Sequence, residues 1–224
     1  MMQKLVILSL FVLFFSCKKE SAVNNQTDNQ TNNQKLSKGT WPIVPGNYWV
    51  YRDSLFNNDG TFRNVVTNDT FRTSTSVTFN GQVFYGPYDN FGFTYYRQVD
   101  DSTTEVFGND FRKQSNIIFR QVKNNNTVIW SKEEDGNAFF NGAFNNYHSV
   151  NSLTGFTDIT SVNGYDCIRN EAVLSWSGTV GSKTILYVKP GVGLVRLLQY
   201  NMKNQSLGDV YLTLKMDLLS YKLK

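Results

Sequence analysis

The sequence predicts an all-β protein, a single antiparallel β-barrel or half-barrel domain that follows a disordered tether. Apolar residues recur at every second position in many short segments, which is the periodicity of half-buried strands. Dipeptides that favour tight turns separate these segments. No segment holds an apolar repeat of 3.6 residues over three helical turns. We therefore expect roughly ten to twelve short strands, joined mainly as hairpins.

Residues 1–16 predict an export signal. Lys4 gives a positive start, an apolar run of eleven residues occupies 5–15, and the small residue Ser16 precedes Cys17. As a helix this run would be only about 17 Å long, which is too short for a hydrocarbon core of about 30 Å. The segment is therefore typical of a cleaved signal rather than of a permanent transmembrane helix.

The end of this signal, residues 14–17 (FFSC), resembles the lipobox of bacterial lipoproteins. In that family the chain is cut before the cysteine, and the cysteine carries acyl chains. The resemblance implies a membrane anchor on Cys17. An ordinary secretory signal fits less well, because Phe14 and Phe15 stand where its second small residue would lie.

Residues 17–40 predict a lipidated cysteine and a polar spacer. Positions 24–34 read NNQTDNQTNNQ and contain no apolar residue, so they cannot bury enough surface to offset the entropy of ordering. Such a segment would separate the folded domain from the membrane by about 25 Å.

The folded domain is expected to cover residues 41–224. Its clearest alternation occupies 210–218, where apolar residues alternate with polar ones, and a second occupies 71–79. Shorter runs occupy 91–99, 116–122, 184–188 and 194–200. Turns are expected at Asn58-Asp59-Gly60, Asn80-Gly81, Asn124-Asn125-Asn126, Asp135-Gly136, Asn163-Gly164 and Gly191-Val192-Gly193. Closing the sheet into a barrel would remove its exposed edges.

Three stretches of the domain resemble a group of uncharacterised Bacteroidota-type lipoproteins. They are WPIVPGNYWVY at 41–51, YVKPGVGLVR at 187–196 and LLSYKL at 218–223. That group opens its domain with a P-x-x-x-G-N-x-W-x-Y strand and carries a later G-V-G-L-V strand. The resemblance implies a β-barrel or half-barrel, and it brings no catalytic residue with it.

Composition argues against several function classes. The formal net charge is +4, or about +3 after loss of Lys4, and the basic residues are scattered, unlike a nucleic-acid footprint. With Cys17 lipidated, Cys167 has no disulfide partner and is expected to be a small core residue. The single histidine, His148, lies in a polar stretch that resembles a loop and cannot build a zinc helix.

The acidic run Glu133-Glu134-Asp135-Gly136-Asn137 is expected at a hairpin tip, because the spacing of a calcium loop is absent. No metal site and no cofactor are predicted.

Aromatic residues make up 15% of the chain. Most should pack the barrel, but such rings also stack on sugars or line apolar cavities. The candidate ligand contacts are Trp49, Trp130 and Trp176. Two tripeptides that begin at Asp53 and Asp101 resemble a bacterial O-glycosylation pattern, which would modify Ser54 and Ser102; tripeptides this short also arise by chance.

These observations favour a non-enzymatic cell-envelope lipoprotein of the outer membrane, whose β domain binds an envelope protein, a glycan or an apolar molecule. The membrane face stays open. One alternative is a carrier with an internal cavity for a lipid, and another is an envelope hydrolase that acts on glycans.

Overall fold

The computed structural model describes residues 39–88, 94–108, 114–140, 143–203 and 206–224, and these contain strands and turns only. In chain order the strands are β1 (Tyr48–Phe56), β2 (Phe62–Phe79), β3 (Gln82–Tyr88), β4 (Thr94–Gln98), β5 (Thr103–Gly108), β6 (Gln114–Arg120), β7 (Thr127–Phe140), β8 (Ala143–Val162), β9 (Tyr165–Trp176), β10 (Thr179–Lys189), β11 (Gly193–Lys203) and β12 (Ser206–Lys222). The all-β prediction and the expected strand number are confirmed.

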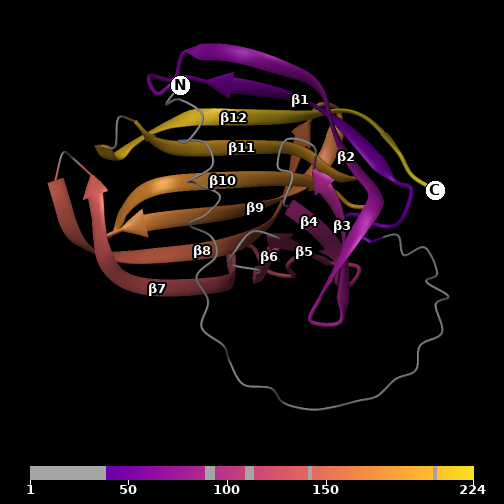
Figure 1. Cartoon of the computed structure of the whole chain (residues 1–224), viewed down its shortest axis with the longest axis horizontal. Coiled ribbons are helices and arrows are strands. Elements are labelled where there is room, and N and C mark those ends of the chain that lie inside the picture. Colours follow the sequence, from indigo (N-terminus) through magenta and orange to yellow (C-terminus); the bar gives the residue numbers. More distant parts are fainter. Residues whose placement is uncertain (1–38, 89–93, 109–113, 141–142, 204–205) are drawn as a thin grey trace.

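All twelve strands form one antiparallel sheet with the order β6-β5-β4-β3-β2-β1-β12-β11-β10-β9-β8-β7. Neighbours in the chain pair as hairpins except β6 and β7, and the first strand pairs with the last. The sheet curls until its two end strands approach each other, which gives a nearly closed barrel (Figure 1).

The register places one set of side chains inside the barrel. Trp49, Tyr51 and Asp53 on β1 point inward, and their partners on β2 and β12 include Phe71 and Met216. Each of these five side chains is no more than 3% exposed. This alternation follows from the period of two along each strand. The domain therefore has one continuous core within the curled sheet.

The segment before β1 fills the space at one end of the barrel. Trp41 and Ile43 are both 3% exposed. The ring of Trp41 lies edge-on to Trp49 and Phe71, with centroids 6.0 and 5.9 Å away. Its plane passes so close to Gly193 that a Cβ there would lie 2.3 Å from the ring. The Trp-Pro motif is thus part of the core.

Most predicted turns lie where the sequence placed them. Asn80 and Asn163 have φ angles of 49° and 52°, as tight two-residue turns require. The turn at Ser177-Gly178 was not anticipated.

The expected turn at Asp135-Gly136 was wrong, because both residues lie within the long strand β7. His148, expected in a loop, lies opposite Asp135 on β8. Glu133 and Asn137 are also in β7, so the acidic run is part of a strand and not a hairpin tip.

Among the described residues, no helix is long and apolar enough to cross a membrane. The signal segment at 1–16, Cys17 and most of the tether lie outside the described residues.

Candidate apolar binding site

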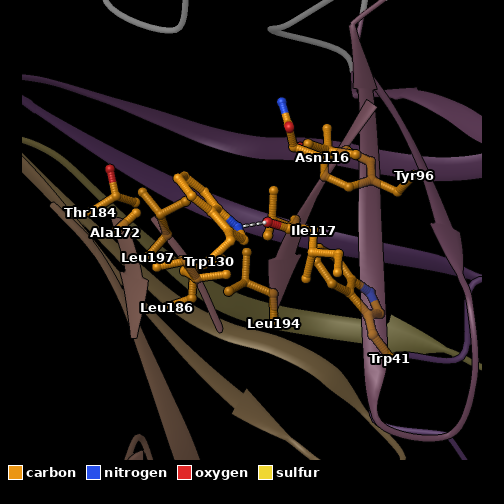
Figure 2. A pocket seen from close by; sticks show the side chains of 13 residues that line it. Trp41, Tyr96, Asn116, Ile117, Trp130, Ala172, Thr184, Leu186, Leu194 and Leu197 are labelled. Atoms are coloured by element: carbon orange, nitrogen blue, oxygen red, sulfur yellow. Dashed lines mark hydrogen bonds between the residues drawn. The ribbon is translucent and has the colours of Figure 1, made fainter. Parts of the chain in front are cut away.

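A cavity of about 80 Å³ lies inside the barrel, between the inner faces of β8–β11 and the strand β6. Its wall is mainly apolar and is shown in Figure 2; the lining residues are Trp41, Tyr96, Val106, Asn116, Ile117, Ile118, Trp130, Leu153, Ala172, Thr184, Leu186, Leu194 and Leu197. Ligand pockets usually measure about 300–1,000 Å³. The cavity is therefore too small to enclose a whole lipid.

The cavity lies beside the seam between the two end strands of the sheet. β6 and β7 are consecutive in the chain, yet they stand at opposite ends of the strand order. Side chains cross this seam where a backbone ladder would close an ordinary barrel. Backbone hydrogen bonds join the other neighbouring strands, whereas side-chain contacts join the two end strands.

Asn170 on β9 holds the end of β6. Its Oδ1 accepts the backbone N–H of Arg120 at 2.8 Å, and its Nδ2 donates to the carbonyl of Arg120 at 3.1 Å. The Asn170 side chain is only 1% exposed, and both bonds are partly buried. One amide thereby satisfies both backbone groups of an end-strand residue.

Trp130 holds the middle of the seam. It follows a β-bulge in β7, and its indole Nε1–H donates to the carbonyl of Ile117 on β6 at 2.9 Å. Figure 2 shows this bond beside the ring, which forms part of the cavity wall. Trp130 is the one predicted ligand-contacting tryptophan that lines the cavity.

The connection between the end strands also packs against β8, the neighbour of β7. Val122, just after β6, lies over Gly155 of β8, where a Cβ would be 2.6 Å from the Val122 Cγ1. Glycine at this position lets the connection approach the strand closely.

A polar cluster lies within the barrel near β1 and β2. Asp53 and Asp69 are 3% and 4% exposed, and Asp69 is the cross-strand partner of Tyr51. Burial, and then the neighbouring charges of Asp53 and Asp69, raise the pKa of Tyr51. Burial and the charge of Asp69 also raise the pKa of Tyr96. Both phenols therefore stay protonated and remain hydrogen-bond donors; Tyr51 donates to the carbonyl of Leu194 at 3.2 Å.

The other two predicted tryptophans lie elsewhere in the core. Trp49 is fully buried, stacks on Phe71 with a centroid distance of 5.3 Å, and donates from Nε1 to the carbonyl of Val192 at 2.6 Å. Trp176 is 7% exposed and its ring packs directly on Gly181. Neither ring lines the cavity.

The two serines of the glycosylation tripeptides occupy different settings. Ser54 lies within β1, paired on one side with Val65 and on the other with Lys215. Ser102 lies in the turn between β4 and β5, where its hydroxyl bonds to Asp100 Oδ1 at 2.8 Å. Modification of either residue stays a prediction.

The single histidine belongs to a surface group on the β7–β8 hairpin. His148 Nδ1 lies 2.9 Å from Asp135 Oδ1, and Nε2 lies 3.6 Å from Glu133 Oε2. The imidazole is half exposed. Across the described ranges, no three His, Cys, Asp or Glu residues gather closely enough to hold a metal ion.

Cys167 is fully buried, as expected of a small core residue. Burial raises the pKa of its thiol to about 11.

Sequence reasoning missed three residues that shape the site. The sequence pattern does not mark Asn170 as a contact of β6, because a single amide in an alternating strand looks like any other inward-facing polar residue. Trp41 and Tyr96 were visible as aromatics, but no spacing connects them to β6. Only the folded sheet brings these side chains together with Trp130.

No protein-family model matches the chain, and no curated protein matches it. Two solved structures are similar in part. One is a protein of Bacteroides fragilis, inferred to be exported and described with a YmcC-like fold, at 11% identity, covering 82% of this chain and 98% of that one with a TM-score of 0.33. The other is a protein of Parabacteroides distasonis inferred to be a lipoprotein, with the same identity and coverage and a TM-score of 0.28. Since both TM-scores are below 0.5, neither likeness supports a conclusion about this chain.

Proposed function

We propose that this chain is a lipid-anchored protein of the bacterial cell envelope, held by acyl chains on Cys17, whose β-barrel acts as a non-enzymatic binding module. The sequence at 1–17 supports the proposed lipid anchor, because a short apolar run there ends in Ser16-Cys17. Two or three acyl chains give a stable anchor, whereas a single one binds a membrane only marginally.

The geometry of the domain supports the binding role. Its first and last strands pair, so the twelve described strands form one continuous sheet. The cavity beside the seam offers apolar surface and few polar groups, which suits binding by exclusion of water.

The outer membrane is the proposed location, because Lys18 rather than an aspartate follows the cysteine. The resemblance of the domain's opening and later strands to Bacteroidota-type lipoproteins fits the same proposal.

Metabolic labelling with an alkyne-bearing fatty acid tests the anchor. The wild-type chain and Cys167→Ala should both take up the label, and Cys17→Ala should lose it. Undiminished labelling of Cys17→Ala would contradict the proposal. Protease treatment of intact cells then reports the membrane face, since a surface domain is digested and a periplasmic one is protected.

A carrier is the second candidate, favoured by the apolar cavity that lies beside an incompletely paired seam. The volume of about 80 Å³ restricts it to holding part of a ligand. A bound lipid recovered by native mass spectrometry, with its polar part accessible to reagents, would support this role.

A further inference from the structure

The shape of the cavity restricts its ligand. The lining runs along β10 from Thr184 to Leu186 and on to Leu194, which is the cross-strand partner of Val188. Four residues of strand correspond to about 13 Å. The cavity volume of about 80 Å³ is too small to fill this whole length, so the channel has room for only a few carbon atoms. The tip of a linear chain fits such a space, whereas benzene is held in an engineered cavity of about 150 Å³.

The chemistry of the cavity wall restricts the ligand further. An engineered apolar cavity of about 150 Å³ stays dry and takes up benzene, because water finds too few polar partners in it. The present cavity is smaller, and its lining includes Leu186, Leu197 and Leu153. It therefore favours hydrocarbon over water and over charged groups.

The seam provides a route into this channel. Between most strands a ladder of backbone bonds would have to break, whereas at the middle of the seam the Trp130 N–H bond to Ile117 crosses the gap. Rotation of the Trp130 ring breaks that bond and removes part of the cavity wall at the same time. Asn170 keeps the end of β6 in place during such a movement.

We infer that the cavity binds the end of a single linear alkyl chain, which enters between β6 and β7 when the Trp130 ring swings aside. The polar end of the ligand stays outside the barrel wall. The inference rests on the proposed function in treating the domain as a binding module, but it does not require a lipid on Cys17.

The test uses chain 17–224 with Cys17→Ser, which contains every strand of the sheet, and ω-bromododecanoic acid as the probe. Bromine quenches tryptophan fluorescence on contact, and Trp41 and Trp130 both line the channel. We expect saturable quenching by this probe at concentrations below its micelle threshold. Absence of quenching in that range would overturn the inference.

The decisive variant is a substitution that fills the channel. Ala172→Leu adds three carbons at the cavity wall, whereas Val173→Leu enlarges a side chain by one carbon on the outer face of the same strand. Ala172→Leu should weaken binding at least about tenfold, and Val173→Leu should leave it unchanged. If Ala172→Leu does not fold, Thr184→Leu fills the channel from its cross-strand partner. Equal binding by wild type and a folded filled variant would show that the probe binds elsewhere.

Two measurements need no filled variant. On the wild type, dodecanoic acid should displace the probe, and adamantaneacetic acid, with the same charge but a rigid cage, should not. Equal displacement by both would refute the linear-chain site. Trp130→Phe, which keeps an aromatic side chain but loses the indole N–H and its bond to Ile117, should speed probe entry several-fold; an unchanged rate would rule out the seam as the route. Loss of Cys17 labelling with intact probe binding, or the reverse, separates failure of the anchor from failure of this site.

Discussion

The side-chain amide of Asn170 bonds to both the backbone N–H and the backbone carbonyl of Arg120, fifty positions earlier in the chain. In an antiparallel ladder, a residue on the neighbouring strand supplies this pair of bonds. Here a side chain from the inner face of β9 supplies them. The end of β6 is therefore held by a contact that one substitution can remove.

Asn170→Ala should lower the free energy of unfolding by about 1–3 kcal/mol, because it leaves a partly buried donor and a partly buried acceptor of Arg120 without the Asn170 amide. Chemical denaturation measures this change. Hydrogen exchange should accelerate most in β6. Asn64→Ala, at an exposed position of β2, is the control and should change stability by less than about 0.5 kcal/mol. A similar small effect for Asn170→Ala would mean that the seam does not depend on this amide.

Two glycines of one turn should respond differently to alanine. Gly191 has a φ angle of 79° and open space around its missing side chain, so Gly191→Ala should cost only the strain of the left-handed conformation, about 1 kcal/mol. Gly193 has a φ angle of 109°, and its Cβ would lie 2.3 Å from the Trp41 ring. Gly193→Ala should therefore cost about 3 kcal/mol or more. Thermal unfolding of the two variants compares them, and equal losses would argue against close packing of Trp41 on this turn.

Asp217 should make the stability of the domain sensitive to acid. Burial alone would raise the pKa of this carboxyl, but hydrogen bonds from Lys215, Arg196 and Asn163 hold it below its usual value. The folded state thus favours the ionised form, and this stabilisation is present at neutral pH and lost as the pH falls through the folded pKa. The loss should begin below about pH 5, since an unfolded Asp titrates near 3.9.

Urea unfolding of Asp217→Asn between pH 7 and pH 3 checks this dependence. The variant should be about 1 kcal/mol less stable than wild type at pH 7, and the two should converge in acid. Asp166→Asn, at an exposed carboxylate, should follow the wild-type curve. A constant difference between Asp217→Asn and wild type at every pH would contradict the role assigned to the charge.

Cys167 should be inert in the folded protein. Its side chain is fully buried and burial raises its pKa to about 11, so almost no thiolate exists near pH 8. In the Cys17→Ser chain, Ellman's reagent should find no reactive thiol in the native state and one after unfolding in urea. Rapid native labelling would show that the strand around Cys167 opens readily.

The strands were predictable because half-buried strands impose a period of two, as in residues 210–218 of β12. The misplaced turn at Asp135-Gly136 has a physical reason. These residues continue β7, the long end strand, where charges such as Glu133 and Asp135 discourage pairing with other chains. Local turn propensity was outweighed there by pairing with β8.

The candidate site was predictable only in part. Trp130 was identified as an aromatic worth testing, and it does line the cavity. Its partner Ile117 and the amide of Asn170 could not be connected to it, because contacts across the seam follow no sequence periodicity. The volume of the cavity depends on how side chains from six or more strands pack, which no spacing encodes.

The pairing of β1 with β12 also constrains the order in which the chain can fold. A polypeptide that leaves a ribosome or a translocation channel from its N-terminus exposes β1 long before β12 exists. Until the last 17-residue strand emerges, both β1 and β11 lack a neighbour, and their open edges can pair with other chains. The domain should therefore depend on chaperones up to the end of synthesis, and loss of residues 206–222 should produce aggregation rather than a smaller barrel.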